Sequence, residues 1–208
     1  ETFSNVETDA KAWLDKVFFK VEKLKSAEVT HIDPLQNWSV SRETEAGDMV
    51  LAGLGEEEEL DSSRSYSLKN ILSSPSFNDI AASDVSDEDL GLDAPIKASL
   101  ATFDGFNYEL LIGKANEEEE YPVRVTVSAS ITQERVAAED EKAEDKEKLD
   151  TEFAVQVKTL TDKLESEQKF QGHTFMVSKW TIDALTKPRS DYIKAIEEET
   201  SEDGIGNA

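Results

Sequence analysis

The fold is decided by the stretch Ile96–Lys114, IKASLATFDGFNYELLIGK, which predicts a β-hairpin. Asp104-Gly105 lies at its centre, and this dipeptide is a strong hairpin signal because a type I′ turn needs positive φ at both central residues. Side chains alternate along both arms of the hairpin, so each strand has one face suited to a core. The residues of that face are Ala98, Leu100 and Thr102 before the turn, and Tyr108, Leu110 and Ile112 after it. The pairing predicts an antiparallel sheet in the middle of the chain.

The same element order is predicted twice, as three strands, a helix and a further strand. In residues 26–82 the strand patterns are Ala27–Ile32, Asn37–Glu43, Met49–Leu54 and Ser76–Ala82; a helix runs from Asp61 or Ser62 to Leu72, after a solvated acidic linker at Glu56–Glu59. In residues 96–180 the strands end at Phe103, Ile112, Ala129 and Ser178. We therefore predict an α+β fold with two antiparallel-sheet halves of βββαβ order, each sheet covered by a helix.

Residues 83–95 are predicted to be a joint between the halves. Its run Asp84–Asp89, DVSDED, is similar to a calcium-binding loop but lacks the central Gly and the twelfth-position Glu that such a loop uses. Ser86 followed three residues later by Asp89 instead matches a helix-capping pattern. We therefore predict a capped helical turn here.

The second half carries a long helix, predicted over residues 132–169. An apolar stripe at helical spacing marks its second part: Leu149, Phe153, Val157, Leu160 and Leu164. The preceding segment, Thr132–Lys148, is nearly all Ala, Glu, Asp and Lys, with good helix propensity but little to bury. It should therefore project into solvent, either as an extension of the helix or as a mobile arm.

The two ends of the chain are predicted to flank these halves. Residues 1–25 form a lead-in and an N-terminal helix, which carries Ala10, Trp13, Leu14, Val17 and Phe18 at i, i+3, i+4 spacing. Residues 181–198 form short C-terminal helices interrupted at Pro188. Residues 199–208 are predicted to be a disordered tail.

Composition excludes several classes of function. The chain has 208 residues, 46 acids against 22 bases, and a net charge of −24, which repels phosphate backbones and anionic lipid surfaces. It has no cysteine, so disulfides, thiolate nucleophiles and Cys-ligated metals are excluded. No segment has the length of a membrane span or the pattern of a signal peptide. Because the chain begins at Glu1, we expect a processed or shortened form, with an anchor or a leader removed.

Few ionisable residues qualify as a reactive site. Glu109 is the one acid singled out, because it lies inside the central hairpin, but the alternation predicts that it faces solvent. His31 and His173, one in each half, would suit zinc or iron if they met beside an acid, yet no HExxH spacing brings them together. We predict no metal site.

The other notable side chains have structural interpretations. Arg42 and Arg124 fall near strand centres, where pairing with a neighbouring carboxylate is favoured over substrate binding. Trp38 and Trp180 are predicted to pack in the core. No nucleophile elbow, P-loop or dinucleotide-binding fingerprint occurs. The sequence therefore predicts no catalytic residue, no cofactor and no enzyme.

Several phrases together resemble a bacterial domain-of-unknown-function family. They are VFFKVEKLKS (residues 17–26), WSVSRE (38–43), LGLDAP (90–95), FNYELLIGK (106–114) and VSKWTIDALTKPRS (177–190). Members of this family typically carry an N-terminal membrane anchor and a β-rich extracytoplasmic part. They are often encoded beside the auxiliary subunit of gliding-motility-type ABC transporters. The resemblance implies an envelope location and carries over no functional residues; residues 132–148 look like an insertion.

Two functions of different class follow. The leading one is a non-enzymatic binding or structural module on the extracytoplasmic face of a bacterial membrane, in the periplasm. Its partners would be envelope proteins, with transporter auxiliary subunits suspected. Exposed sheet edges and the protruding helix are the candidate contact surfaces. The alternative is a carboxylate-dependent hydrolase acting on glycan, which would require two convergent acids in a deep cleft, one of them desolvated.

Overall fold

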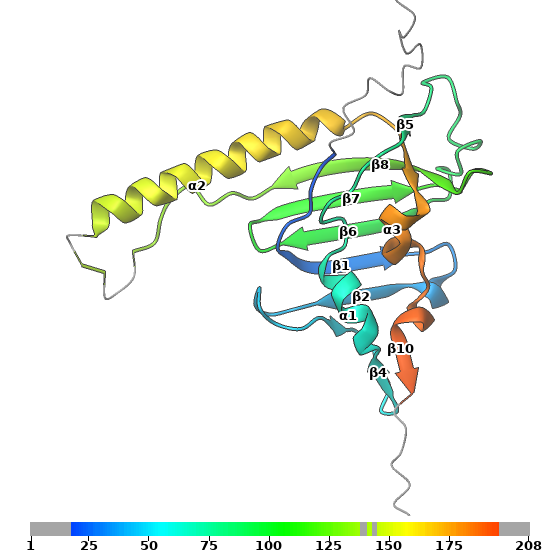
Figure 1. Cartoon of the computed structure of the whole chain (residues 1–208), viewed down its shortest axis with the longest axis horizontal. Coiled ribbons are helices and arrows are strands. Elements are labelled where there is room, and N and C mark those ends of the chain that lie inside the picture. The colour runs from blue at the N-terminus through cyan, green and yellow to red at the C-terminus, as the bar shows by residue number, and fades with distance from the viewer. Residues whose placement is uncertain (1–17, 138–140, 143–144, 196–208) are drawn as a thin grey trace, which may run out of the picture.

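The computed structural model describes residues 18–137, 141–142 and 145–195. It has a mixed α+β fold, as predicted, built on one large antiparallel sheet of eight strands in the order β3-β2-β1-β6-β7-β8-β9-β5 (Figure 1). The predicted N-terminal helix over the first residues and the predicted tail at residues 199–208 lie outside the described residues.

The elements have the following bounds. The large sheet contains β1 (Leu24–Thr30), β2 (Trp38–Ser41), β3 (Val50–Leu51), β5 (Asp79–Ile80), β6 (Ile96–Thr102), β7 (Phe106–Ile112), β8 (Glu120–Ala129) and β9 (Phe175–Ser178). A second sheet pairs β4 (Glu58–Leu60) with β10 (Ile193–Ala195). The α-helices of the described part are α1 (Ser62–Lys69), α2 (Lys146–Glu167) and α3 (Lys179–Thr186), and short 3₁₀ turns are η2 (Pro34–Gln36), η3 (Gln168–Phe170) and η4 (Arg189–Tyr192).

The two predicted halves share one sheet. β1 pairs antiparallel with β6, with Ala27 opposite Leu100, so the sheet runs without a break from the first half into the second. β5, the last strand of the first half, does not return to β3 but pairs with β9 at the opposite edge of the sheet. Neither half is therefore a closed unit.

The central hairpin is confirmed, with a different turn. β6 and β7 pair antiparallel as predicted, with Leu100 opposite Tyr108. The loop has three residues, Phe103 to Gly105, and only Gly105 has positive φ, at 82°. The Gly105 N–H donates to the Thr102 carbonyl at 3.2 Å. This is the three-residue loop closed by a left-handed Gly, not the expected two-residue type I′ turn.

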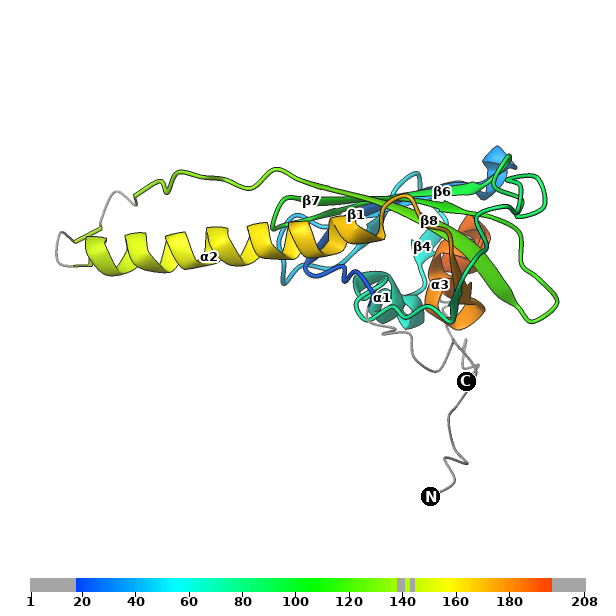
Figure 2. The same ribbon diagram turned by 90° about the horizontal axis from the view of Figure 1, so that it is seen from above.

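One face of the sheet is covered and forms the core (Figure 2). Alternate residues of β6, β7 and β8 are buried there, as the sequence predicts, and Leu68 of α1 with Ile182 and Leu185 of α3 completes the layer. A group of four phenylalanines, Phe18, Phe77, Phe170 and Phe175, packs together at the β9 end. These contacts bring residues from both ends of the chain onto the same face.

The long helix differs from its prediction. α2 begins at Lys146, whereas residues 132–137 run as a chain without helical structure. Over residues 132–137, helix propensity alone is not enough to form a helix. The predicted protruding helix is confirmed for the described residues: α2 extends well beyond the ends of the strands (Figure 1).

Two further predictions are wrong. The acidic linker Glu56–Glu59 contributes to β4, and the described residues after Pro188, where a helix is predicted, form η4 and β10. Lys194 Nζ lies 2.8 Å from Glu59 Oε1 across these strands. This cross-strand ion pair stabilises the acidic segment within a sheet.

Candidate functional site

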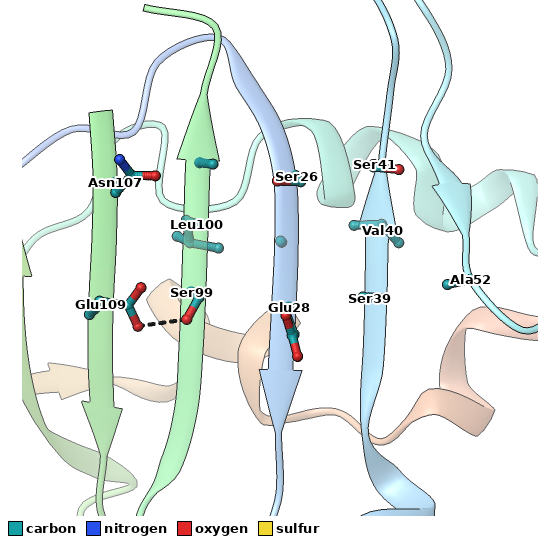
Figure 3. Close-up of a pocket in the computed structure, with 12 residues that line it drawn as sticks. Ser26, Glu28, Ser39, Val40, Ser41, Ala52, Ser99, Leu100, Asn107 and Glu109 are labelled. Atoms are coloured by element: carbon teal, nitrogen blue, oxygen red, sulfur yellow. Dashed lines mark hydrogen bonds between the residues drawn. The ribbon is translucent and has the colours of Figure 1, made fainter. Parts of the chain in front are cut away.

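The candidate site is the uncovered face of the sheet, which no described element crosses (Figure 2). Two rows of side chains run across its four central strands β2, β1, β6 and β7, as the strand register defines. One row is Ser41, Ser26, Ala101 and Asn107; the other is Ser39, Glu28, Ser99 and Glu109. Their side chains project together from the strands in Figure 3. We call these two rows the open-face platform.

The open-face platform contains a depression because most of its side chains are short. Serine and alanine occupy most of its central positions and leave a shallow depression of about 260 Å³ that reaches Ala52 beside the sheet edge. Exposed sheet faces usually carry longer polar side chains, so the backbone here is unusually accessible. A partner could approach these strands more closely than it could approach the rest of the surface.

Two carboxylates lie in the hollow. Ser99 Oγ donates to Glu109 Oε2 at 2.6 Å, and Glu28 occupies the same row on β1 (Figure 3). With β6 between them, the backbones of Glu28 and Glu109 are about 9–10 Å apart. Both side chains are exposed, as the sequence predicts for Glu109. They can bind cations or hydrogen-bond donors, but no apolar wall desolvates either acid.

The structure places the two histidines far apart. Three strands lie between β1 and β9, so these two strands are about 19 Å apart across the sheet. His31 is buried and its Nε2–H donates to the Lys187 carbonyl at 3.1 Å; burial lowers its pKa. His173 is exposed beside Phe175. Within the described residues, no group of three or more His, Asp or Glu is arranged to hold a metal ion.

The joint forms the predicted capped turn. Ser86 Oγ accepts the Asp89 N–H at 3.1 Å and donates to Asp89 Oδ2 at 2.6 Å. Asp87 accepts two hydrogen bonds from Arg124, at 2.6 and 3.0 Å, and this guanidinium lowers the pKa of Asp87. The prediction of a carboxylate partner for Arg124 is confirmed, and the partner comes from the joint, not from a neighbouring strand.

Arg42 behaves differently from its prediction. Its Nε donates to the Leu24 carbonyl at 2.7 Å, a second nitrogen donates to the Glu45 carbonyl, and the guanidinium lies 5.6 Å from the centre of the Phe103 ring. Backbone carbonyls and an aromatic face thus replace the expected carboxylate.

The two tryptophans lie in different environments. Trp38 is in the core, with Nε1–H donating to the Lys187 carbonyl at 3.0 Å, as predicted. Trp180 is 87% exposed, so its predicted core role is wrong. Helix α3 begins immediately after β9, and its buried side carries Ile182 and Leu185, which turns Trp180 outward.

One buried acid, Glu167, is not predicted from the sequence. Glu167, at the end of α2, is 5% exposed; its Oε1 accepts the Lys20 N–H and its Oε2 accepts the Tyr108 O–H, both at 2.8 Å. Lys163 lies 3.4 Å from the same carboxylate. Burial and this carboxylate raise the pKa of Tyr108. The signal was the position of Glu167 three residues after Leu164, on the apolar side of the helix.

Comparison with known proteins assigns no family. No protein-family model, no curated protein and no solved structure matches the chain. Among the described residues, none of the helices combines the length and apolar character required to cross a membrane. The fold and platform thus define an α+β protein with a one-sided antiparallel sheet, and the resemblance to envelope proteins stays a prediction.

Proposed function

We propose that this chain is a non-enzymatic binding module that acts through protein contacts at its open-face platform. One observation carries this proposal: the central strands β2, β1, β6 and β7 are covered on one face and bare on the other. A sheet face of short side chains allows a second layer to pack closely, at about the 10 Å separation of stacked sheets.

The location and partner class follow from the resemblance. We place the module at the extracytoplasmic face of a bacterial membrane, held there by an anchor outside this chain. Its partners would be envelope proteins, such as the auxiliary subunit of an ABC-type transporter or a gliding-related complex. The net charge of −24 favours partners with a basic contact surface.

The test blocks the platform without touching the core. In a crosslinked capture from envelope membranes, Ser26→Arg should strongly reduce recovery of the partner, because Ser26 lies at the centre of the hollow. Thr126→Arg is the matched control. Thr126 lies on β8, on the same face of the sheet as Ser26 but outside the hollow. Capture of no envelope protein by the wild type, or equal capture by both variants, would contradict the proposal.

A glycan hydrolase is the second candidate. The observation in its favour is that Glu28 and Glu109 share one row, separated by a single strand, at a spacing within reach of a water-activating acid pair. Such an enzyme needs one desolvated acid, and both of these are exposed. Release of reducing ends from cell-wall glycan by the wild type, abolished in both Glu28→Gln and Glu109→Gln, would establish this function instead.

A further inference from the structure

A second surface lies away from the platform, on the projection formed by segment 130–137 and the first part of α2, which we call the arm. The segment continues β8 past the sheet, and α2 returns beside it (Figure 2). Arg135 joins the two, with Nε 2.7 Å from Asp150 Oδ1 on the helix and further hydrogen bonds to Glu141. The described part of the arm is thus held in a defined geometry.

An apolar groove lies between the segment and the helix. It encloses about 390 Å³, and its apolar lining comes from both sides of the arm: Ile131, Val136, Phe153, Val157 and Leu160. The helix residues of this lining are only half-buried, and Val136 is 89% exposed. The segment therefore covers the apolar stripe of α2 incompletely.

The main-chain groups of the segment are also available for hydrogen bonds to a partner. In the described part of the chain, the Ser130 N–H donates to the Gly105 carbonyl at 2.9 Å, but Ile131 to Ala137 make no backbone–backbone hydrogen bond. The Ile131 carbonyl accepts the Gln133 side chain at 3.1 Å. The segment has no regular secondary structure and bends at Glu134. Its unpaired main-chain donors and acceptors lie beside an apolar groove, which is the combination that strand addition uses.

We propose that the arm binds an extended, basic polypeptide segment, which pairs with residues 131–137 and places every second side chain in the groove. This inference rests on the proposed function and names a kind of partner for it. The alternation follows from strand geometry, because residues i and i+2 share a face. The basic character follows from charge. Glu134 borders the groove, the Arg135 beside it is already bound to Asp150 and Glu141, and Asp104 at the groove is bound to Lys23 at 3.1 Å. The chain carries −24 overall. The same charge opposes docking of a second copy.

The first test uses peptides of about eight residues that alternate Val and Lys. Two versions are N-methylated, one at every Val amide and one at every Lys amide. Because successive amides of a strand point to opposite edges, only one version loses the hydrogen bonds to the arm. We expect binding at least about tenfold weaker for one version alone, which is about 1.4 kcal/mol. Since the charges are identical, equal binding of both versions would overturn the proposal.

The second test uses a matched pair on α2. Val157 lines the groove, whereas Val155 lies on the same helix, is 61% exposed and is not part of the lining. We expect Val157→Asp to weaken binding of the unmethylated peptide at least about tenfold, and Val155→Asp, with the same added charge, to change it by less than about twofold. Equal effects would overturn the proposal.

Amide hydrogen exchange on the wild type gives a readout that does not depend on folding of a variant. Addition of the unmethylated peptide should slow exchange at alternate amides within residues 131–137. Unchanged exchange there at saturating peptide would overturn the proposal. So would a dimer of the wild type that Val157→Asp dissociates, since the groove would then hold a second copy.

The failure of this inference is distinct from failure of the proposed function. If envelope capture is lost in Ser26→Arg but unchanged in Val157→Asp, the platform binds the partner and the arm does not. If the wild type captures no envelope protein, the proposed function fails regardless of peptide binding. Loss of capture in Val157→Asp and not in Val155→Asp supports the arm as a partner surface.

Discussion

The two faces of the large sheet are made by the same strands and have opposite characters. On β6, Leu100 is 1% exposed, while its neighbour Ser99 faces the open-face platform. On β7, Tyr108 is fully buried and Glu109 is exposed. The buried face therefore provides the stability of the sheet, and the open face is available for contacts with a partner. Matched substitutions of adjacent residues test this division directly.

The largest difference is expected between Leu100→Ala and Ser99→Ala. Removal of the Leu100 side chain from a packed layer should lower the free energy of unfolding by about 2–5 kcal/mol. Ser99→Ala should change it by less than about 0.5 kcal/mol, because Ser99 bonds only to an exposed carboxylate. Urea unfolding measures both. Similar losses in the two variants would mean that the open face also supports the fold.

Tyr108→Phe and Glu109→Gln form the next pair. Loss of the Tyr108 hydroxyl removes a donor from the buried Glu167 carboxylate, at an expected cost of about 1–3 kcal/mol. Glu109→Gln should stay within about 0.5 kcal/mol of the wild type. Since Glu167 fixes the end of α2, amide exchange at the end of that helix should increase in Tyr108→Phe alone. If Tyr108→Phe unfolds with the same free energy as the wild type, the hydrogen bond between Tyr108 and Glu167 does not stabilise the fold.

The histidines give a smaller, pH-dependent effect. Burial lowers the pKa of His31, although the bond to the Lys187 carbonyl acts in the opposite sense. The unfolded chain therefore takes up a proton at a higher pH than the folded chain, so stability present above the ordinary pKa of 6.5 is lost as the pH falls below it.

Between about pH 7.5 and about pH 5.5 the urea midpoint of the wild type should fall, and His31→Gln should flatten this slope. His173→Gln, which removes an exposed imidazole, is measured over the same pH range as the control. A slope unchanged in His31→Gln would assign the effect to carboxylates instead.

The smallest effect is expected at the ion pair of the joint. Asp87→Asn should lower the midpoint slightly, because an exposed pair contributes little even when both oxygens are bonded. Because Arg124 lowers the Asp87 pKa, this contribution should be present at neutral pH and vanish as acid protonates Asp87 below its ordinary 3.8. Glu88→Gln removes the same charge one residue away and should have no such pH dependence.

The sequence predicts the local parts of this fold well. The β6–β7 hairpin, the Asp61-capped helix α1 and the Ser86 turn all depend on residues a few positions apart. The joining of β1 to β6, and of β5 to β9, depends on contacts between distant residues that no short pattern encodes. For the same reason β10 was mistaken for a helix: its strand character comes from its partner β4.

The candidate site was predicted less completely. Alternation placed Glu109 on the exposed face, but the hollow depends on the rows formed by four strands, and their order was unknown. Among 46 acids, no composition argument distinguishes Glu167, whose burial depends on Tyr108 and Lys20 from other elements. Trp180 was misplaced because the start of α3, not hydrophobicity, determines its direction.

The crossing of β5 to the far edge has a consequence for biosynthesis. During translation the N-terminal half emerges first, yet its last strand has no neighbour until residues 175–178 leave the ribosome. The nascent protein therefore keeps the edge of β5 exposed until β9 has been synthesised. Folding should accordingly be slow and all-or-none, and a fragment that stops before β9 should require a chaperone to stay in solution.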